Sequence, residues 1–190
     1  MTIKTKVPPP IVALAIWFLI NYTKDEFPKI HIGMEKIIGS VLIISGLIVI
    51  ASAIILFKKN KTTVTPLDPS RSTKLITRGI YKYSRNPMYL GLSFVLSGVS
   101  IIVNPIGGFI FIPLFILYLN FFQIMPEENA MTDLFEKEFL EYKKSVRRWI
   151  WFLSSIAVLS AVNQVLIVFW RSFQNGVGMG FQQSGGSVLF

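Results

Sequence analysis

The sequence has 190 residues, of which 52% are hydrophobic and 15% charged, and its mean hydropathy is +0.57. An ordinary soluble domain is about one quarter charged, so this composition excludes one and favours a membrane protein. The net charge is +9 and there is no cysteine, which excludes disulfides and thiolate metal sites. The single histidine, His31, cannot form a zinc site by itself, and we expect no bound metal.

The apolar blocks predict an all-α fold, a polytopic transmembrane bundle of four or five membrane helices. The first block, residues 11–22, follows a basic N-terminus and three prolines, Pro8 to Pro10. About 12 residues rising 1.5 Å each are short for a hydrocarbon core of about 30 Å, so this helix needs its prolines or Phe27 to cross. A signal peptide is the alternative for this block, although no small-residue cleavage site follows.

Three further blocks, 37–57, 87–103 and 105–125, are long enough to span. The small residues of the first of these suit close contact with another helix: Gly39, Ser45, Gly46 and Ser52. The other two each begin with a proline, which a first helical turn accepts, and only Asn104 separates them. They therefore predict a tight antiparallel hairpin, with a kink expected at Pro113.

The pattern changes after residue 126 to an amphipathic helix over 127–146. Its apolar side recurs every three or four residues: Met131, Leu134, Phe135, Phe139, Tyr142 and Val146. A last apolar block, 149–170, has aromatic ends but five polar residues, so whether it spans fully stays open, as it does for 11–22. We expect one domain over 1–170 and a disordered Gly-, Gln- and Ser-rich tail over 171–190.

The positive charges flank the apolar blocks. Of the 19 Lys and Arg residues, eight lie within 58–85 and five within 137–148. The positive-inside rule accounts for this distribution better than nucleic-acid binding does, and it places the N-terminus and both basic segments in the cytoplasm. The amphipathic helix and the active site are therefore expected on the cytoplasmic side of a multi-pass protein, in the inner membrane if the cell is prokaryotic.

The residues 75–91 mix charged and aromatic side chains at the mouth of a membrane helix and contain the run Arg85 to Gly91, RNPMYLG. Taken alone, this run is also typical of plain anchoring at the membrane interface. The adjacent carboxylates Glu127 and Glu128 lie near the apolar side of their helix, where a charge needs a partner or a task. Capping of the helix N-terminus explains them equally well.

The third motif, residues 141–150, reads EYKKSVRRWI and by itself predicts a basic helix that attracts anionic lipid. The order and spacing of all three motifs resemble the isoprenylcysteine carboxyl methyltransferase and phospholipid methyltransferase family. The resemblance covers about residues 62–150. It implies a membrane enzyme that uses S-adenosylmethionine and releases S-adenosylhomocysteine, without a Rossmann domain, and no glycine-rich dinucleotide motif is present.

The resemblance also implies site residues. The cofactor shell would comprise Lys74, Leu75, Ile76, Tyr81, Asn86, Pro87, Met88, Tyr89, Gly91, Glu127 and Glu128. Catalytic roles fall to Glu127, Arg148 and Arg85, with Glu127 pairing the amino or ribose groups of the cofactor and either arginine its carboxylate. Gln123, Tyr142 and Arg148 would contact the acceptor substrate.

The chain departs from the family pattern at several positions. Asn86 stands where the family often has histidine, and Glu136 and Phe139 replace the usual glycine and first tyrosine. Gln123 replaces an arginine that contacts substrate in the prenylcysteine enzymes, which puts that particular substrate in doubt. The block after Ile150 has no counterpart in the short family core.

The sequence therefore predicts a methyltransferase for a lipophilic acceptor that enters from the bilayer. Because the site offers no histidine or cysteine as a base, a carboxylate or thiolate acceptor resembling isoprenylcysteine is favoured over an amine. A phospholipid N-methyltransferase is the first alternative. A non-enzymatic scaffold or transporter subunit is the second, although the spans carry no charge at their centres.

Overall fold

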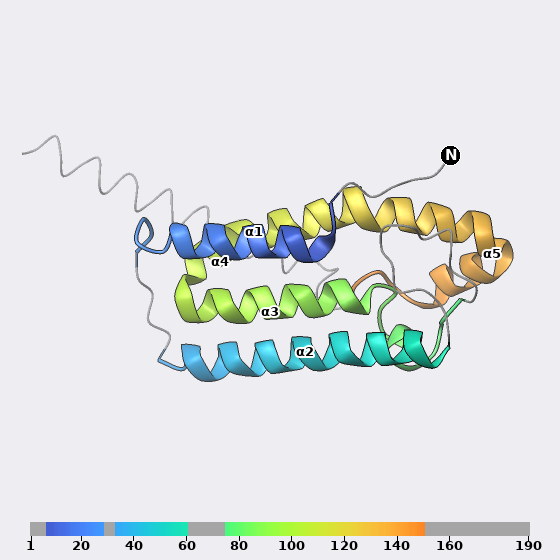
Figure 1. Cartoon of the computed structure of the whole chain (residues 1–190), viewed down its shortest axis with the longest axis horizontal. Helices are drawn as coiled ribbons and strands as arrows, with labels where there is room; N and C mark the ends of the chain where they lie inside the picture. Colours follow the sequence, from blue (N-terminus) through green and yellow to red (C-terminus); the bar gives the residue numbers. More distant parts are fainter. Residues whose placement is uncertain (1–6, 29–32, 61–74, 151–190) are drawn as a thin grey trace, which may run out of the picture.

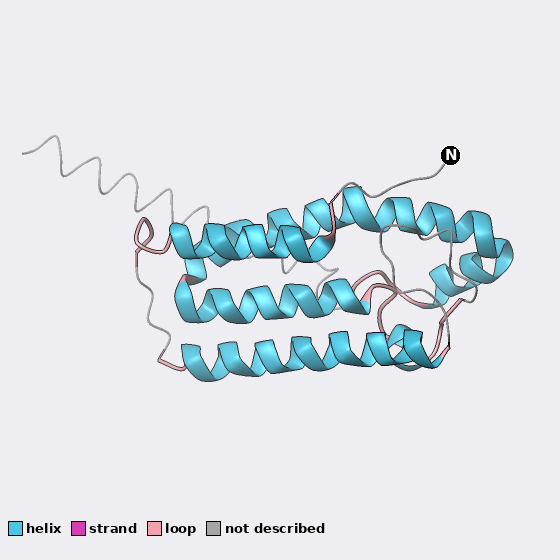
Figure 2. Ribbon diagram, in the orientation of Figure 1, coloured by secondary structure: helices cyan, strands magenta, loops and turns pink. Residues whose placement is uncertain are grey.

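The computed structural model describes residues 7–28, 33–60 and 75–150, and in these ranges the chain is helical with no strand (Figures 1 and 2). The elements are α1 (Pro9–Tyr22), α2 (Glu35–Lys59), the short 3-10 turn η2 (Gly79–Lys82), α3 (Pro87–Val103), α4 (Pro105–Tyr118), η3 (Leu119–Ile124) and α5 (Met125–Ser145). The predicted first, second and third helices are confirmed to within two residues at each end. The prediction of a 149–170 helix and a 171–190 tail lies almost wholly outside the described residues.

Helix α3 is the centre of the bundle, since it contacts α1, α2 and α4 (Figure 1). The antiparallel turn between α3 and α4 is confirmed. The side chain of Asn104 caps α4 by accepting a hydrogen bond from the Gly107 N–H at 3.0 Å, and its amide donates to the Ile20 carbonyl at 3.3 Å. One side chain thus closes the hairpin and ties it to the end of α1.

Two glycine pairs allow α2 and α3 to approach closely. A Cβ atom on Gly46 would lie 2.5 Å from the Gly91 carbonyl oxygen, and one on Gly98 would lie 2.4 Å from that of Gly39. The predicted role of Gly39 and Gly46 in helix contact is confirmed. The same geometry places Gly91 against α2, and its expected place in a cofactor shell stays a prediction.

Two helical stretches are long and apolar enough to cross a membrane, Glu35–Lys59 and Pro105–Ser145. Only 11% of the apolar window of α2 is buried, and large side chains such as Ile37 and Ile48 are more than half exposed. Such a surface is unfavourable in water and suits lipid, so we describe the chain as a membrane protein. The second stretch has 41 residues, about twice the length a span needs, and its apolar part ends near Met125.

The fourth and fifth predicted helices are one continuous helical rod, which corrects the expectation of two separate helices. Helix α4 continues through Pro113, and the departure from α geometry falls in the π-helical segment η3. A π segment turns the following residues relative to those before it. It therefore sets which side of α5 carries Glu127 and Glu128, a rotation that a 3.6-residue periodicity does not reveal.

Helix α5 is bent at Glu136, whose backbone angles are φ 38° and ψ −113°. A positive φ favours glycine. Position 136 is where the methyltransferase family that the sequence resembles usually has glycine. A β-carbon in such a conformation costs on the order of 1–3 kcal/mol. Glu136 is exposed, and no described interaction of its side chain offsets that cost.

Replacing Glu136 with glycine should therefore raise the free energy of unfolding by about 1 kcal/mol. Thermal unfolding of the detergent-solubilised protein measures it. The matched control is Glu138→Gly, an exposed position in regular helix, which should lower stability by about 1 kcal/mol. A loss of stability in both variants would show that Glu136 is not strained.

Candidate functional site

The two basic segments meet at one end of the bundle. The Arg85 N–H donates to the Arg147 carbonyl at 2.9 Å, and the Ser84 hydroxyl donates to the Arg148 carbonyl at 2.6 Å. In Figure 1 the turn before α3 lies beside the chain that follows α5. The predicted meeting of the two segments, more than 60 residues apart in sequence, is confirmed; which side of a membrane they face stays a prediction.

Glu128 is the electrostatic centre of this end. Its carboxylate accepts hydrogen bonds from Arg85 (Nη2, 2.8 Å) and Arg148 (Nε, 2.9 Å; Nη2, 2.7 Å), and the Lys143 ammonium lies 3.6 Å away. Its side chain is only 6% exposed. One buried carboxylate therefore contacts three cations from three segments: Arg85 from the turn before α3, Lys143 from α5 and Arg148 from the chain after α5.

These contacts fix the charge of Glu128. Burial opposes ionisation, but the hydrogen bonds from Arg148 and Arg85 outweigh it and hold the pKa of Glu128 below its usual value. The same pairing raises the pKa of Arg148. Glu128 was expected in the cofactor shell, whereas its contacts show a carboxylate engaged in holding the site together.

Arg85 is committed to the fold as well. Its Nε and Nη2 bond Glu128, and its Nη1 donates to the carbonyls of Lys143 and Val146. Its side chain is 10% exposed. Four of its five N–H groups are therefore used within the protein, and only one N–H of Nη2 is without a described partner. The expected catalytic role of Arg85, pairing the cofactor carboxylate, stays a prediction.

Glu127 differs from its neighbour. Its carboxylate accepts a hydrogen bond from the Tyr89 hydroxyl, and within the described ranges it forms no ion pair. Burial, opposed by the Tyr89 bond and assisted by Glu128, raises the pKa of Glu127 to about 7. The bond joins the predicted Tyr89 and Glu127 directly, and it leaves the carboxylate without a cation among the described residues.

A buried aromatic cluster around Tyr81 lies near this carboxylate. Tyr81 packs edge-on against Phe57 with ring centroids 5.6 Å apart, and its backbone carbonyl accepts a 2.7 Å hydrogen bond from the Tyr142 hydroxyl. Burial, then Tyr142 and Glu127, raises the pKa of Tyr81, so its hydroxyl stays protonated. The hydroxyl of Tyr142 is engaged in this buried contact, and its expected contact with the substrate stays a prediction.

The other predicted residues lie in different parts of the fold. Ile76, with Leu75 and Met88 against it, belongs to the apolar cluster around Tyr81, and Pro87 is buried at the start of α3. Asn86 caps nothing, and its buried Nδ2 has no partner within the described residues. Gln123 is fully buried and donates to the Val7 carbonyl at 2.6 Å, and its expected contact with the substrate stays a prediction. Lys74 lies outside the described residues.

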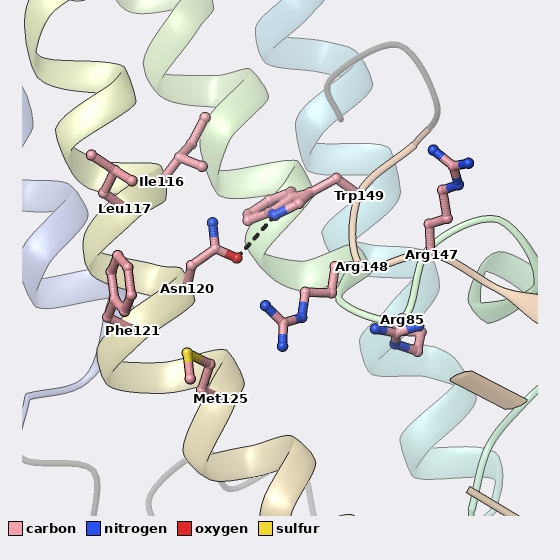
Figure 3. A pocket seen from close by; sticks show the side chains of 9 residues that line it. All are labelled: Arg85, Ile116, Leu117, Asn120, Phe121, Met125, Arg147, Arg148 and Trp149. Carbon is pink, nitrogen blue, oxygen red and sulfur yellow. Dashed lines mark hydrogen bonds between the residues drawn. The ribbon is translucent and has the colours of Figure 1, made fainter. Parts of the chain in front are cut away.

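A cavity of about 550 Å³ is lined in part by Arg85 and Arg148, the two arginines that bond Glu128 (Figure 3). Its polar residues are Arg85, Asn120, Arg147 and Arg148, and its apolar residues are Ile116, Leu117, Phe121, Met125 and Trp149. The Trp149 indole donates to the Asn120 side-chain oxygen at 3.2 Å. Asn120 and Trp149 were missed as site residues, although an asparagine inside an apolar span was a usable signal.

The family model described as phospholipid methyltransferase matches residues 34–138, more than half of the chain. Together with a helical membrane fold whose carboxylates gather at one end, this defines the class. The chain belongs to the phospholipid methyltransferase family.

Several relatives carry the name protein-S-isoprenylcysteine O-methyltransferase. The Homo sapiens protein is 25% identical over 152 residues, covering 78% of this chain and 52% of that protein. The Arabidopsis thaliana form A is 28% identical over 118 residues (61% and 59%), and the Saccharomyces cerevisiae protein 36% over 74 residues (38% and 30%). The chain thus spans about half the length of the human relative. No solved structure matches it significantly.

Proposed function

We propose that this chain is an integral membrane methyltransferase that takes a methyl group from S-adenosylmethionine and transfers it to a lipophilic carboxylate or thiol resembling isoprenylcysteine. One observation carries the proposal: two adjacent glutamates stand in opposite electrostatic states. Glu128 is neutralised by three cations, whereas Glu127 has only the Tyr89 hydroxyl. A carboxylate without a cation beside aromatic rings suits a ligand that brings its own positive charge.

The described residues fit this cofactor. Glu127 would bind its amino or ribose groups, and Tyr81 and Tyr89 would provide aromatic surface for the adenine or the cationic sulfur. Arg85 acts as a positioning residue, because it fixes Glu128 and the chain after α5. Leu75, Ile76 and Met88 pack in the cluster around Tyr81 and would complete the wall of this part of the site, and Asn86 would contribute its Nδ2 group.

When bound, the cofactor supplies an electrophilic methyl group on a sulfonium, which an acceptor oxygen or sulfur takes by in-line displacement. The protein's task is to hold donor and acceptor close and aligned, which can supply several kcal/mol of the barrier. A carboxylate acceptor is already anionic at neutral pH and needs no general base. The names of the matched relatives favour this acceptor class over an amine headgroup.

The membrane arrangement is part of the proposal. Helices α1 to α4 would cross the bilayer, with the Glu127–Glu128 end at the cytoplasmic surface, as the basic segments at that end favour. Helix α1 has 14 residues and begins at Pro9, as the shortness of the predicted block required. The domain would extend over residues 1–170, and its acceptor would enter laterally from the lipid.

S-adenosylhomocysteine binding tests the cofactor assignment. The product at 100 times its dissociation constant should stabilise the detergent-purified protein by about 2.7 kcal/mol, seen as a rise in Tm. Adenosine alone should give a smaller shift, because it lacks the amino acid that Glu127 would bind. An unchanged Tm at millimolar product would favour the scaffold or transporter alternative.

A further inference from the structure

The polar end of the cavity beside Arg148 presents hydrogen-bond donors from Asn120 and Arg148. The indole nitrogen of Trp149 is solely a donor, so the Asn120 amide must turn its oxygen toward it, as the 3.2 Å contact shows (Figure 3). This orientation leaves the Asn120 NH₂ group, with two N–H bonds, for the cavity that Asn120 lines. Trp149 thereby decides which end of the amide a ligand meets.

The charge of this end is positive. Arg148 bonds Glu128 through Nε and Nη2, so its Nη1 has no described protein partner, and its side chain is one-third exposed. Figure 3 shows the Arg148 side chain extending across the cavity toward Asn120 and Met125. Because Glu128 is one carboxylate shared among Arg85, Arg148 and Lys143, the surroundings keep an excess of positive charge.

The opposite wall is apolar and exposed at the surface of the bundle. Leu117, Phe121 and Met125 line the cavity, and they are 51%, 61% and 43% exposed. All three lie on the outer side of the rod formed by α4, η3 and the start of α5. A hydrocarbon chain can therefore lie along this wall while its head reaches Asn120 and Arg148.

We propose that this cavity binds the anionic head of a single-chain amphiphile, with Asn120 as the residue that selects an anion over an amine. The inference rests on the proposed function in one respect only, that this amphiphile is the methyl acceptor. A carboxylate or phosphate head supplies acceptors for the Asn120 and Arg148 donors. An ammonium head brings further donors and positive charge, which the Asn120 NH₂ group and the Arg148 guanidinium disfavour.

The experiment measures displacement of a dansyl-labelled undecanoate from the protein in neutral detergent micelles, with empty micelles as background. Tetradecanoate and tetradecyl phosphate should displace it, and tetradecylamine should not. Acetate and inorganic phosphate should not displace it either, since they make no use of the apolar wall. Displacement by the amine at the same concentration, or by the free anions, would overturn the proposal.

Asn120→Asp keeps the shape and the contact with Trp149 but turns an acceptor into the cavity. Amphiphile binding should weaken at least tenfold, the loss expected when a hydrogen bond to a charged group is removed. The matched control is Asn129→Asp, the same change at an exposed position of α5, which should bind as the unmodified protein does. Unchanged binding in Asn120→Asp would also overturn the proposal.

Two further measurements separate the remaining readings. Trp149→Phe removes the N–H that orients the amide, so tetradecylamine should begin to displace the probe while tetradecanoate weakens. If Asn120→Asp instead weakened S-adenosylhomocysteine and left the amphiphile unaffected, the anion recognised here would be the cofactor's carboxylate and the proposal would be wrong. If the protein did not bind S-adenosylhomocysteine but still bound anionic amphiphiles in preference to the amine, the result would contradict the proposed function and leave this inference standing.

Discussion

Glu128→Gln should lower the free energy of unfolding in detergent by about 3 kcal/mol. Removing one partner of a buried ion pair costs about 3–5 kcal/mol, because the remaining charges stay buried without compensation. Here Arg85 is 10% exposed and Arg148 33%, so Arg148 can recover some hydration and the lower figure applies. Chemical denaturation followed by helix content measures the loss.

Glu127→Gln is the matched control for this prediction, since it makes the same change one residue away. Its amide oxygen can still accept the Tyr89 hydrogen bond. Burial raises the pKa of Glu127 to about 7, above the value in the unfolded chain, so its ionisation costs stability at neutral pH and Glu127→Gln should not lower the free energy of unfolding. Equal losses in the two variants would contradict the division of roles between the two glutamates.

Glu127→Gln should instead weaken S-adenosylhomocysteine binding by about 10- to 100-fold, measured by calorimetry at pH 8. This is the loss expected for one charge-assisted hydrogen bond. The charged form of Glu127 binds the cationic ligand group, and burial raises its pKa to about 7. Affinity of the unmodified protein should therefore be full above pH 7 and fall as the pH drops below it.

The variant should show no such dependence between pH 6 and pH 8, because glutamine does not titrate in that range. Glu141→Gln, an exposed carboxylate on the same helix, should keep both the affinity and its pH profile. Undiminished affinity in Glu127→Gln would remove the role assigned to Glu127 and leave Tyr89 as its only known partner.

The sequence predicted the features that depend on local pattern. Apolar length and helix-starting prolines placed α2 and α3, and the small residues Gly39 and Gly46 pointed to close helix packing. The pairing of the Arg85 turn with the acidic residues followed from topology, because two successive antiparallel helices return the chain to the same end of the bundle. These inferences needed only periodicity, charge distribution and hairpin geometry.

The features that depend on side-chain partners were not predictable in this way. Whether Arg85 faces a ligand or Glu128 depends on a rotation set by the π segment η3, which has no simple sequence signature. Asn120 and Trp149 gain their role only from the hydrogen bond between them, across 29 residues. The bend at Glu136 was marked only by the absence of a glycine that the family pattern expects.

Transfer of a labelled methyl group tests the account most directly. Membranes containing the protein are incubated with trideuteromethyl S-adenosylmethionine and a lipid extract, and the lipid-soluble products are analysed by mass spectrometry. We predict a deuterated methyl ester or thioether that appears with the unmodified protein and is strongly reduced with Glu127→Gln. The account would be contradicted if the protein bound S-adenosylmethionine without transferring its methyl group. It would also be contradicted if the label appeared only on amine headgroups.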